Sequence, residues 1–373
     1  MIFNYGFSMV GKSHLLQNKP CQDAHCIRRL DNGWYVGAVA DGVGSRPNAE
    51  EGAQLAVKTA VDFVSAYMPY DYSIAGMKSM LRTAYYHAMK TIIRHAAEKD
   101  LPVENFDTTL SLAIYDGRHI VYAHSGDGAI IGLTNFGQLV EITRRQKAED
   151  GISLIPLRQG YSSWEIDVYE ENLAGVLLVT DGVLDALSPY LLKMQAPETS
   201  PQASALYMPI GSWLLDPAGI PEDEEGQALL REKIGRYIAG DQDYDIEFFY
   251  ERLKTVYEAR IPEEAEEIIA GLRRYNYPVS LMESSQDDKT AVGLINTEAF
   301  IESLPAESYA DVDWIELQEK WNRLAYPSLY KEKEDDADDE KPSFHKWMKK
   351  WNRLEPKSGE VKNNEKEDPE LVL

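Results

Sequence analysis

The sequence has little cysteine and a shortage of basic charge. It contains only two cysteines, Cys21 and Cys26, with no second pair to complete a zinc site. Lysine and arginine together number 38 against 62 acidic residues, which gives a formal net charge of −24. Nucleic acids and anionic membranes bind basic surfaces, so neither is expected as a partner. The excess acid suits a protein that holds divalent cations or meets basic surfaces, or it is spread over solvated helices and a tail.

Long apolar runs are absent as well. No stretch approaches the roughly 18 consecutive apolar residues of a membrane span. The first residues, MIFNYGFSMVG, lack the basic and then apolar pattern of a signal peptide. We therefore expect a cytoplasmic protein. Hydrophobic residues still make up 44% of the 373 positions, which is ample for a sizeable core.

The order of strand-like and helical patterns predicts an α+β fold. Short strand-like runs fill the first forty residues, and Asn32-Gly33 between two of them is typical of a hairpin turn. Helical spacing follows from Asn48 and again over about residues 73–99. Strands return from about residue 108, and a last one, KTAVGLIN, begins at Lys289. Such an order favours antiparallel sheets covered by helices on the outside.

The pattern also predicts the domain organisation. We expect a catalytic domain over residues 1–300, with a helical insertion at about 189–285 that is rich in proline and acidic clusters. Residues 301–373 would form a helical segment and a tail that is mostly too charged to bury a core. The letters KWNRL occur at 320–324 and again at 350–354. The repeat is either a coincidence or a pair of elements that dock a protein partner.

Asp-Gly pairs occur five times, and their surroundings divide them. Asp-Gly favours tight hairpin turns, which fits Asp116-Gly117 between two strand-like runs. Asp41 and Asp181 instead follow nearly all-apolar runs, YVGAVA and VLLVT, and precede segments of helical character. A carboxylate at the end of a buried strand is costly unless it is paired or bound to a cation. These two aspartates therefore predict a shared cation site.

Further aspartates could complete such a site. Asp23 precedes a strand, Asp127 lies between two strands, and Asp287-Asp288 precedes the last strand. Magnesium and manganese take oxygen ligands and keep several waters. A few carboxylates and a backbone carbonyl would therefore suffice, without a set of histidines or thiolates.

The motif series resembles that of a known family. CQDA, VADGVGS, DTTLSLAI, HSGDGAI, LLVTDGVLDAL and DDKTAVGL come in the order and spacing of the metal-dependent protein phosphatases of the 2C (PPM) type. The resemblance covers about residues 5–188 and 284–296 and is to a prokaryotic-like member with a large insertion. It implies a sandwich of two antiparallel sheets flanked by helices, and it places the 189–285 insertion where the family carries a variable flap.

The resemblance implies a site with two Mn²⁺ or Mg²⁺ ions and a third, weaker metal position. By this resemblance, Asp41 would bridge two metals and Gly42 would offer its carbonyl. Asp181 and Asp287 would bind the first metal directly. Asp23 would hold metal-bound water, and Asp127 would help to bind the third metal. The family pattern prefers Asp287 to Asp288 as the ligand.

The sequence departs from the family pattern at three places. Gln22 stands where the family often has Glu, and Val43 stands where many eukaryotic members have a histidine. Lys12, Ser13 and His14 occupy the region where many members have an arginine that grips the substrate phosphate. Lys12, Ser13 and His14 are therefore the substrate-binding candidates. His14 is the candidate for phosphate contact, against the reading of a structural polar residue near a strand end. The acid that protonates the leaving group would be either metal-bound water or His14.

The activity expected from the resemblance is serine/threonine protein phosphatase, in which a hydroxide that bridges two metals attacks phosphoserine or phosphothreonine. Its partner would be a phosphorylated protein, the product of an opposing kinase. Two alternatives stay open: a phosphatase-like binding or regulatory module with weak catalysis, and a phosphatase of a small phosphorylated metabolite. A kinase is not expected, because the sequence has neither a glycine-rich phosphate loop with its lysine nor an HRD loop.

Overall fold

The computed structural model describes residues 1–147, 154–193, 206–241 and 243–327. Met1–Val312 form one compact unit, and Asp313–Leu373 form a second, described only as far as residue 327. The second unit contains α11 (Trp314–Ala325), which begins where the Asp313 carboxylate accepts hydrogen bonds from the backbone of Ile315 and Glu316. The first KWNRL copy lies on α11, and the second copy lies outside the described residues. Docking of a partner by the tail stays a prediction.

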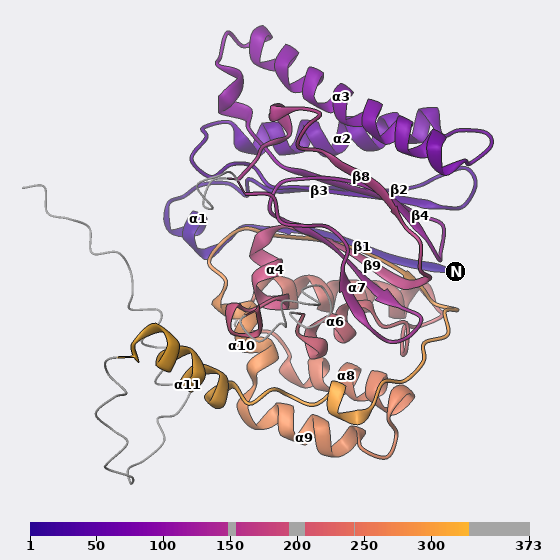
Figure 1. Cartoon of the computed structure of the whole chain (residues 1–373), viewed down its shortest axis with the longest axis vertical. Coiled ribbons are helices and arrows are strands. Elements are labelled where there is room, and N and C mark those ends of the chain that lie inside the picture. Colours follow the sequence, from indigo (N-terminus) through magenta and orange to yellow (C-terminus); the bar gives the residue numbers. More distant parts are fainter. Residues whose placement is uncertain (148–153, 194–205, 242, 328–373) are drawn as a thin grey trace, which may run out of the picture. The chain divides into compact units, whose positions relative to one another are not determined.

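Two five-stranded antiparallel sheets form the centre of the first unit (Figure 1). The first sheet has the order β1 (Ile2–Met9), β10 (Lys289–Asn296), β9 (Leu173–Val179), β6 (Ala129–Thr134), β7 (Leu139–Glu141). The second has the order β2 (Ala24–Arg29), β3 (Tyr35–Ala40), β4 (Leu110–Tyr115), β5 (Ile120–Ser125), β8 (Glu165–Tyr169). The sheets approach closely at Gly37, where a Cβ atom would lie 2.8 Å from Cγ1 of Val292.

Helices cover both sheets on their outer faces (Figure 1). On the second sheet lie α2 (Ala49–Tyr67) and α3 (Ile74–Glu98). The buried face of α2 carries alanines at helical spacing, including Ala53, Ala56 and Ala60, so the helix can pack close to the sheet. The first sheet contacts α6 (Met208–Leu215) and α7 (Glu224–Ala239). The predicted α+β sandwich is confirmed.

The predicted hairpin turns are confirmed, whereas Asn48, the residue before the first long helix, makes no side-chain cap hydrogen bond. β2 and β3 pair through the turn at Asn32-Gly33, and β4 and β5 pair through Asp116-Gly117, with Gly33 and Gly117 at φ +87° and +102°. The helix predicted from about residue 73 begins after Ser73, whose hydroxyl accepts a hydrogen bond from the backbone of Gly76.

In the part of the long connection between β9 and β10 that the structure describes, the regular elements are helices joined by turns and loops. It contains α4 (Asp181–Leu187), α5 (Tyr190–Lys193), α8 (Ile246–Arg260), α9 (Ala265–Tyr275) and α10 (Tyr277–Ser284) together with α6 and α7. Arg260 and the buried Asp216 form a two-armed ion pair with N···O distances of 2.9 and 2.7 Å. The division into a domain, an insertion and a tail stays a prediction, because the compact units alone do not decide it.

Two smaller expectations concern the cysteines and the membrane. Cys21 and Cys26 are both free. Among the described residues, no helix combines the length and the apolar character needed to cross a bilayer.

Candidate metal centre

Aspartates from both sheets meet at one end of the sandwich. Asp41 follows β3 directly, and Asp181 opens α4 just after β9. Asp127 lies in the turn between β5 and β6. One carboxylate oxygen from each of the three lies within 4.8 Å of the others. The sequence placed Asp41 and Asp181 at the ends of buried strands, and the structure confirms that placement.

Two threonines of the DTT motif fix the backbone of Asp41. The amide of Asp41 donates to Oγ1 of Thr109 at 2.8 Å. Its carbonyl accepts from Oγ1 of Thr108 at 2.9 Å and from the amide of Thr109 at 2.8 Å. The Asp41 backbone is thus bound on both sides, so its side chain emerges in a defined direction.

Gly42 is held where no larger residue fits. Its amide donates to the carbonyl of Gln22 at 3.1 Å, and a Cβ atom would lie 2.6 Å from that same oxygen and 2.7 Å from the backbone of Ala49. The predicted use of the Gly42 carbonyl as a metal ligand stays a prediction. Nε2 of the Gln22 side chain donates to the carbonyl of Arg46 at 3.2 Å, and the buried Oε1 of the same side chain has no hydrogen-bond partner among the described residues.

Asp23 is buried beside the three clustered aspartates. Its Oδ2 accepts a 2.8 Å hydrogen bond from Oγ1 of Thr180, which in turn accepts from the amide of Thr290 at 3.0 Å. Burial raises the pKa of Asp23 well above its usual value, and the charges of Asp288 and Asp181 raise it further. The Thr180 bond orients this carboxylate, which fits the predicted role of holding water; that role itself stays a prediction.

The two adjacent aspartates before β10 have different surroundings. Asp288 is buried, and its carboxylate accepts three hydrogen bonds: from the amides of Gly11 at 2.7 Å and Gln22 at 2.6 Å, and from Nδ1 of His14 at 2.9 Å. Asp287 is exposed, lies outside the group of three aspartates, and among the described residues accepts a hydrogen bond from the amide of Asp288 alone, at 2.9 Å. The carboxylate left accessible to a cation is therefore that of Asp287, the residue preferred from the sequence.

The substrate-binding candidates of the first strand region lie on α1 (Lys12–Leu16) and contact the segment before β10. Nζ of Lys12 donates to the carbonyl of Glu283 at 2.8 Å, and Oγ of Ser13 donates to that of Gln286 at 2.9 Å. His14 is buried, with Nδ1 committed to Asp288. These bonds tie α1 to the chain that carries Asp287. Contact of Lys12, Ser13 and His14 with a phosphate stays a prediction.

The carboxylates repel one another. Loss of solvent raises the pKa of Asp41 well above its usual value, and the neighbouring charges, led by Asp23 and Asp181, raise it further. Burial and the charges of Asp127 and Asp287 raise the pKa of Asp181 to about 7. Crowded, poorly solvated carboxylates of this kind are relieved by a bound cation. The all-oxygen donor set suits a hard divalent ion, so the residues present fit the metals that the resemblance implies.

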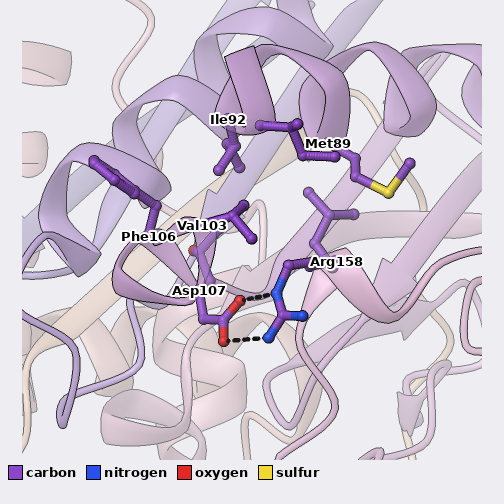
Figure 2. Close-up of a pocket in the computed structure, with 9 residues that line it drawn as sticks. Met89, Ile92, Val103, Phe106, Asp107 and Arg158 are labelled. Carbon is purple, nitrogen blue, oxygen red and sulfur yellow. Dashed lines mark hydrogen bonds and ion pairs between the residues drawn. The ribbon is translucent and has the colours of Figure 1, made fainter. Parts of the chain in front are cut away.

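An ion pair braces the loop that follows Asp41. Arg158 forms two hydrogen bonds with the buried Asp107 (Figure 2): Nε lies 2.7 Å from Oδ1, and a terminal nitrogen lies 2.9 Å from Oδ2. The carbonyl of Asp107 accepts from the amide of Val43 at 3.0 Å. The adjoining cavity has a volume of about 10 Å³, which is the space for a single water. This cavity is too small for a substrate, so Asp107 and Arg158 have a supporting role beside the site.

The turn that carries Asp127 rests on a buried histidine. Nε2 of His124 donates to the carbonyl of Gly126 at 3.1 Å, so the neutral ring accepts at Nδ1 from Oγ of Ser111, 2.8 Å away. Gly126 has φ +126°, a conformation that favours glycine. Burial lowers the pKa of His124 to about 4.

Because His124 is buried in its neutral form, we expect the free energy of unfolding to fall in acid. The unfolded chain takes up a proton near pH 6.5, whereas the folded ring does so only near pH 4. The contribution of His124 is therefore complete above about pH 6.5 and falls by roughly 1.4 kcal/mol per pH unit down to about pH 4, about 3 kcal/mol in all. Urea unfolding from pH 7.5 to 4.5 should show this loss in the wild type, and the loss should be reduced in His124→Gln. Equal pH dependence in the two proteins would contradict it.

Comparison with known proteins identifies the family. The sequence profile of protein phosphatase 2C matches residues 10–206, more than half of the chain. The chain belongs to this family. The protein is accordingly a phosphatase, and the family is metal-dependent.

Solved structures similar to the phosphatase include serine/threonine phosphatases of bacteria. They include the Staphylococcus aureus serine/threonine phosphatase Stp1 at 14% identity, covering 79% of this chain and 95% of that one, with a TM-score of 0.42. The S. agalactiae serine/threonine phosphatase is 13% identical; the match covers 79% of this chain and 99% of that one, with a TM-score of 0.47. The catalytic domain of PstP in complex with two manganese ions is 18% identical; the match covers 79% of this chain and 97% of that one, with a TM-score of 0.45. No curated protein matches the chain.

Several residues that shape the phosphatase site were not assigned from the sequence. Thr108 and Thr109 stand in a motif that was recognised, but their bonds to Asp41 depend on the pairing of β3 with β4. Thr180 precedes Asp181, and its bond to Asp23 joins residues 157 positions apart. Lys147, whose ammonium contacts Oδ2 of Asp127, lies in no recognisable pattern.

Proposed function

We propose that this protein is a metal-dependent serine/threonine protein phosphatase whose divalent ions, Mn²⁺ or Mg²⁺, are held by Asp41, Asp181, Asp287 and the carbonyl of Gly42. The observation that carries the proposal is the convergence of Asp41, Asp127 and Asp181 within 4.8 Å at strand ends of both sheets. Repulsion between these carboxylates destabilises the fold, and a bound cation would relieve it.

The bound ions would supply a water of lowered pKa and neutralise charge on the phosphoryl oxygens. The protein's own residues set the geometry. Thr108 and Thr109 aim Asp41, and Asp288 holds the backbone beside Asp287. Asp23, oriented by Thr180, would accept a hydrogen bond from a water in the site.

The substrate we propose is a phosphoserine or phosphothreonine of a protein, made by an opposing kinase. The net charge of −24 favours a basic phosphoprotein. The helices α5 to α10 of the insertion follow Asp181 and precede Asp287 along the chain, so they are suited to act as the flap that selects substrates. A cytoplasmic location is part of the same proposal.

The test compares two aspartates of one helix. Asp181 belongs to the cluster, whereas Asp185, four residues on, is 64% exposed and pairs with Arg145 at 3.1 Å. Asp181→Asn should lower Mn²⁺-dependent hydrolysis of a phosphothreonine peptide at least 100-fold, and Asp185→Asn should change it less than about threefold. Equal effects would contradict the proposed centre. Preference for an aryl phosphate or a small phosphorylated metabolite over the peptide would instead overturn the protein substrate.

A further inference from the structure

Lys147 brings a fixed positive charge to the acidic cluster. Its Nζ contacts Oδ2 of Asp127, a residue whose side chain is only 3% exposed. The other oxygen, Oδ1, is buried and has no hydrogen-bond partner among the described residues. A lysine therefore contacts one oxygen of Asp127 and leaves the other unpaired, while one oxygen of this carboxylate lies within 4.8 Å of oxygens of Asp41 and Asp181.

The backbone around Lys147 is bound to the turn that it contacts. The amide of Gln146 donates to the carbonyl of Gly126 at 2.8 Å, and Oε1 of Gln146 accepts from the amide of Gly126 at 3.3 Å. Lys147 also forms an isolated antiparallel bridge with Leu154. The lysine is thus tethered beside Asp127 by contacts that do not depend on its own ammonium.

Two other basic side chains of this region, Arg145 and Arg158, pair with aspartates outside the cluster. Arg145 pairs with Asp185 at 3.1 Å, and Arg158 pairs with Asp107 at 2.7 Å. Of the basic residues that the structure describes, Lys147 alone forms an ion pair with one of the three clustered aspartates.

We propose that the Lys147 ammonium takes the place of a third metal ion on Asp127, so that this centre binds two divalent ions where the resemblance implied a third, weaker position. The inference rests on the proposed function. A divalent ion at Oδ2 would have to displace the ammonium or lie against a like charge. Oδ1, which has no partner among the described residues, would be left for a cation shared with Asp41 and Asp181. The lysine therefore acts as a built-in cation of the centre.

The test counts bound Mn²⁺ by isothermal titration and equilibrium dialysis on the full chain at pH 7.5. Wild type should bind two ions. Lys147→Met, which keeps the length of the side chain and removes its charge, should bind a third ion or bind its weakest ion at least tenfold more tightly. Lys147→Arg should match wild type. Lys78→Met is the matched control, because Lys78 pairs with Asp167 at 2.8 Å outside the cluster; it should also match wild type.

Each result decides the inference. Three ions on wild type, or equal number and affinity in wild type and Lys147→Met, would overturn the role of Lys147 and leave the metal centre standing. Failure of wild type to bind Mn²⁺ would overturn the proposed function and this inference with it. If Lys147→Met does not fold, as judged by circular dichroism, Lys147→Gln and the wild-type count decide the matter.

Discussion

Asp41→Asn is expected to lower phosphatase turnover on the order of 10³-fold and to raise the melting temperature of the metal-free protein. Asp41 is the aspartate most surrounded by other carboxylates, since Asp23, Asp181, Asp127 and Asp287 all raise its pKa in addition to burial. Losing it as a ligand removes the several kcal/mol of charge stabilisation that bound metal supplies, and about 4 kcal/mol corresponds to that fold-change.

Both effects of Asp41→Asn, the lost activity and the gained stability, come from removing one carboxylate charge from the cluster. A neutral amide removes one charge from the crowded cluster, so the metal-free variant should be stabilised by about 1 kcal/mol, or roughly 3 °C. Added Mn²⁺ should raise the melting temperature of wild type and have little effect on the variant. Thermal melts with and without Mn²⁺, run beside peptide hydrolysis, measure both effects. A variant that loses activity but still gains wild-type stability from Mn²⁺ would show that Asp41 does not bind the metal.

Asp288→Ala should destabilise the fold by about 3 to 5 kcal/mol and weaken metal binding about 10- to 100-fold. Removal of this carboxylate leaves the amides of Gly11 and Gln22 and Nδ1 of His14 without their acceptor in a buried place. The same three bonds hold the segment that presents Asp287, so the neighbouring ligand loses its position. Urea unfolding measures the first effect, and titration with Mn²⁺ measures the second.

Two controls separate anchoring from a general effect of losing a charge. Asp288→Asn keeps the size and one accepting oxygen, so its cost in unfolding free energy should be about half that of alanine. Asp167→Ala removes a carboxylate that is 55% exposed and paired with Lys78, and it should cost about 0.5 kcal/mol or less. If Asp288→Ala unfolds like Asp167→Ala, the three hydrogen bonds do not anchor the segment.

The layers of the fold and the core of the site could be predicted because their signals are local. The apolar runs before Asp41 and Asp181 mark buried strands, and a charge at the end of such a strand needs a partner. The glycine turns at Gly33 and Gly117 determine the two hairpins in the same local way. Helical alanine spacing likewise determines which face of α2 meets the sheet.

The support of the site could not be predicted, because it joins distant parts of the chain. Asp287 and Asp288 are adjacent and chemically identical, yet the contacts of Asp288 with Gly11 and His14 span more than 270 residues. The pairing of Lys147 with Asp127 depends on how the chain returns after β7 to the turn before β6. Neither relation has a spacing or a motif that would reveal it.

The central claim is that the carboxylates of Asp41, Asp181 and Asp287 make this chain a phosphatase by holding divalent ions. Hydrolysis of a phosphothreonine peptide should be measured on wild type after chelation and again after Mn²⁺ is restored. The account predicts that activity disappears on chelation and returns with Mn²⁺. Turnover that continues unchanged in the chelated enzyme, or no turnover by folded enzyme shown to have bound Mn²⁺, would contradict it.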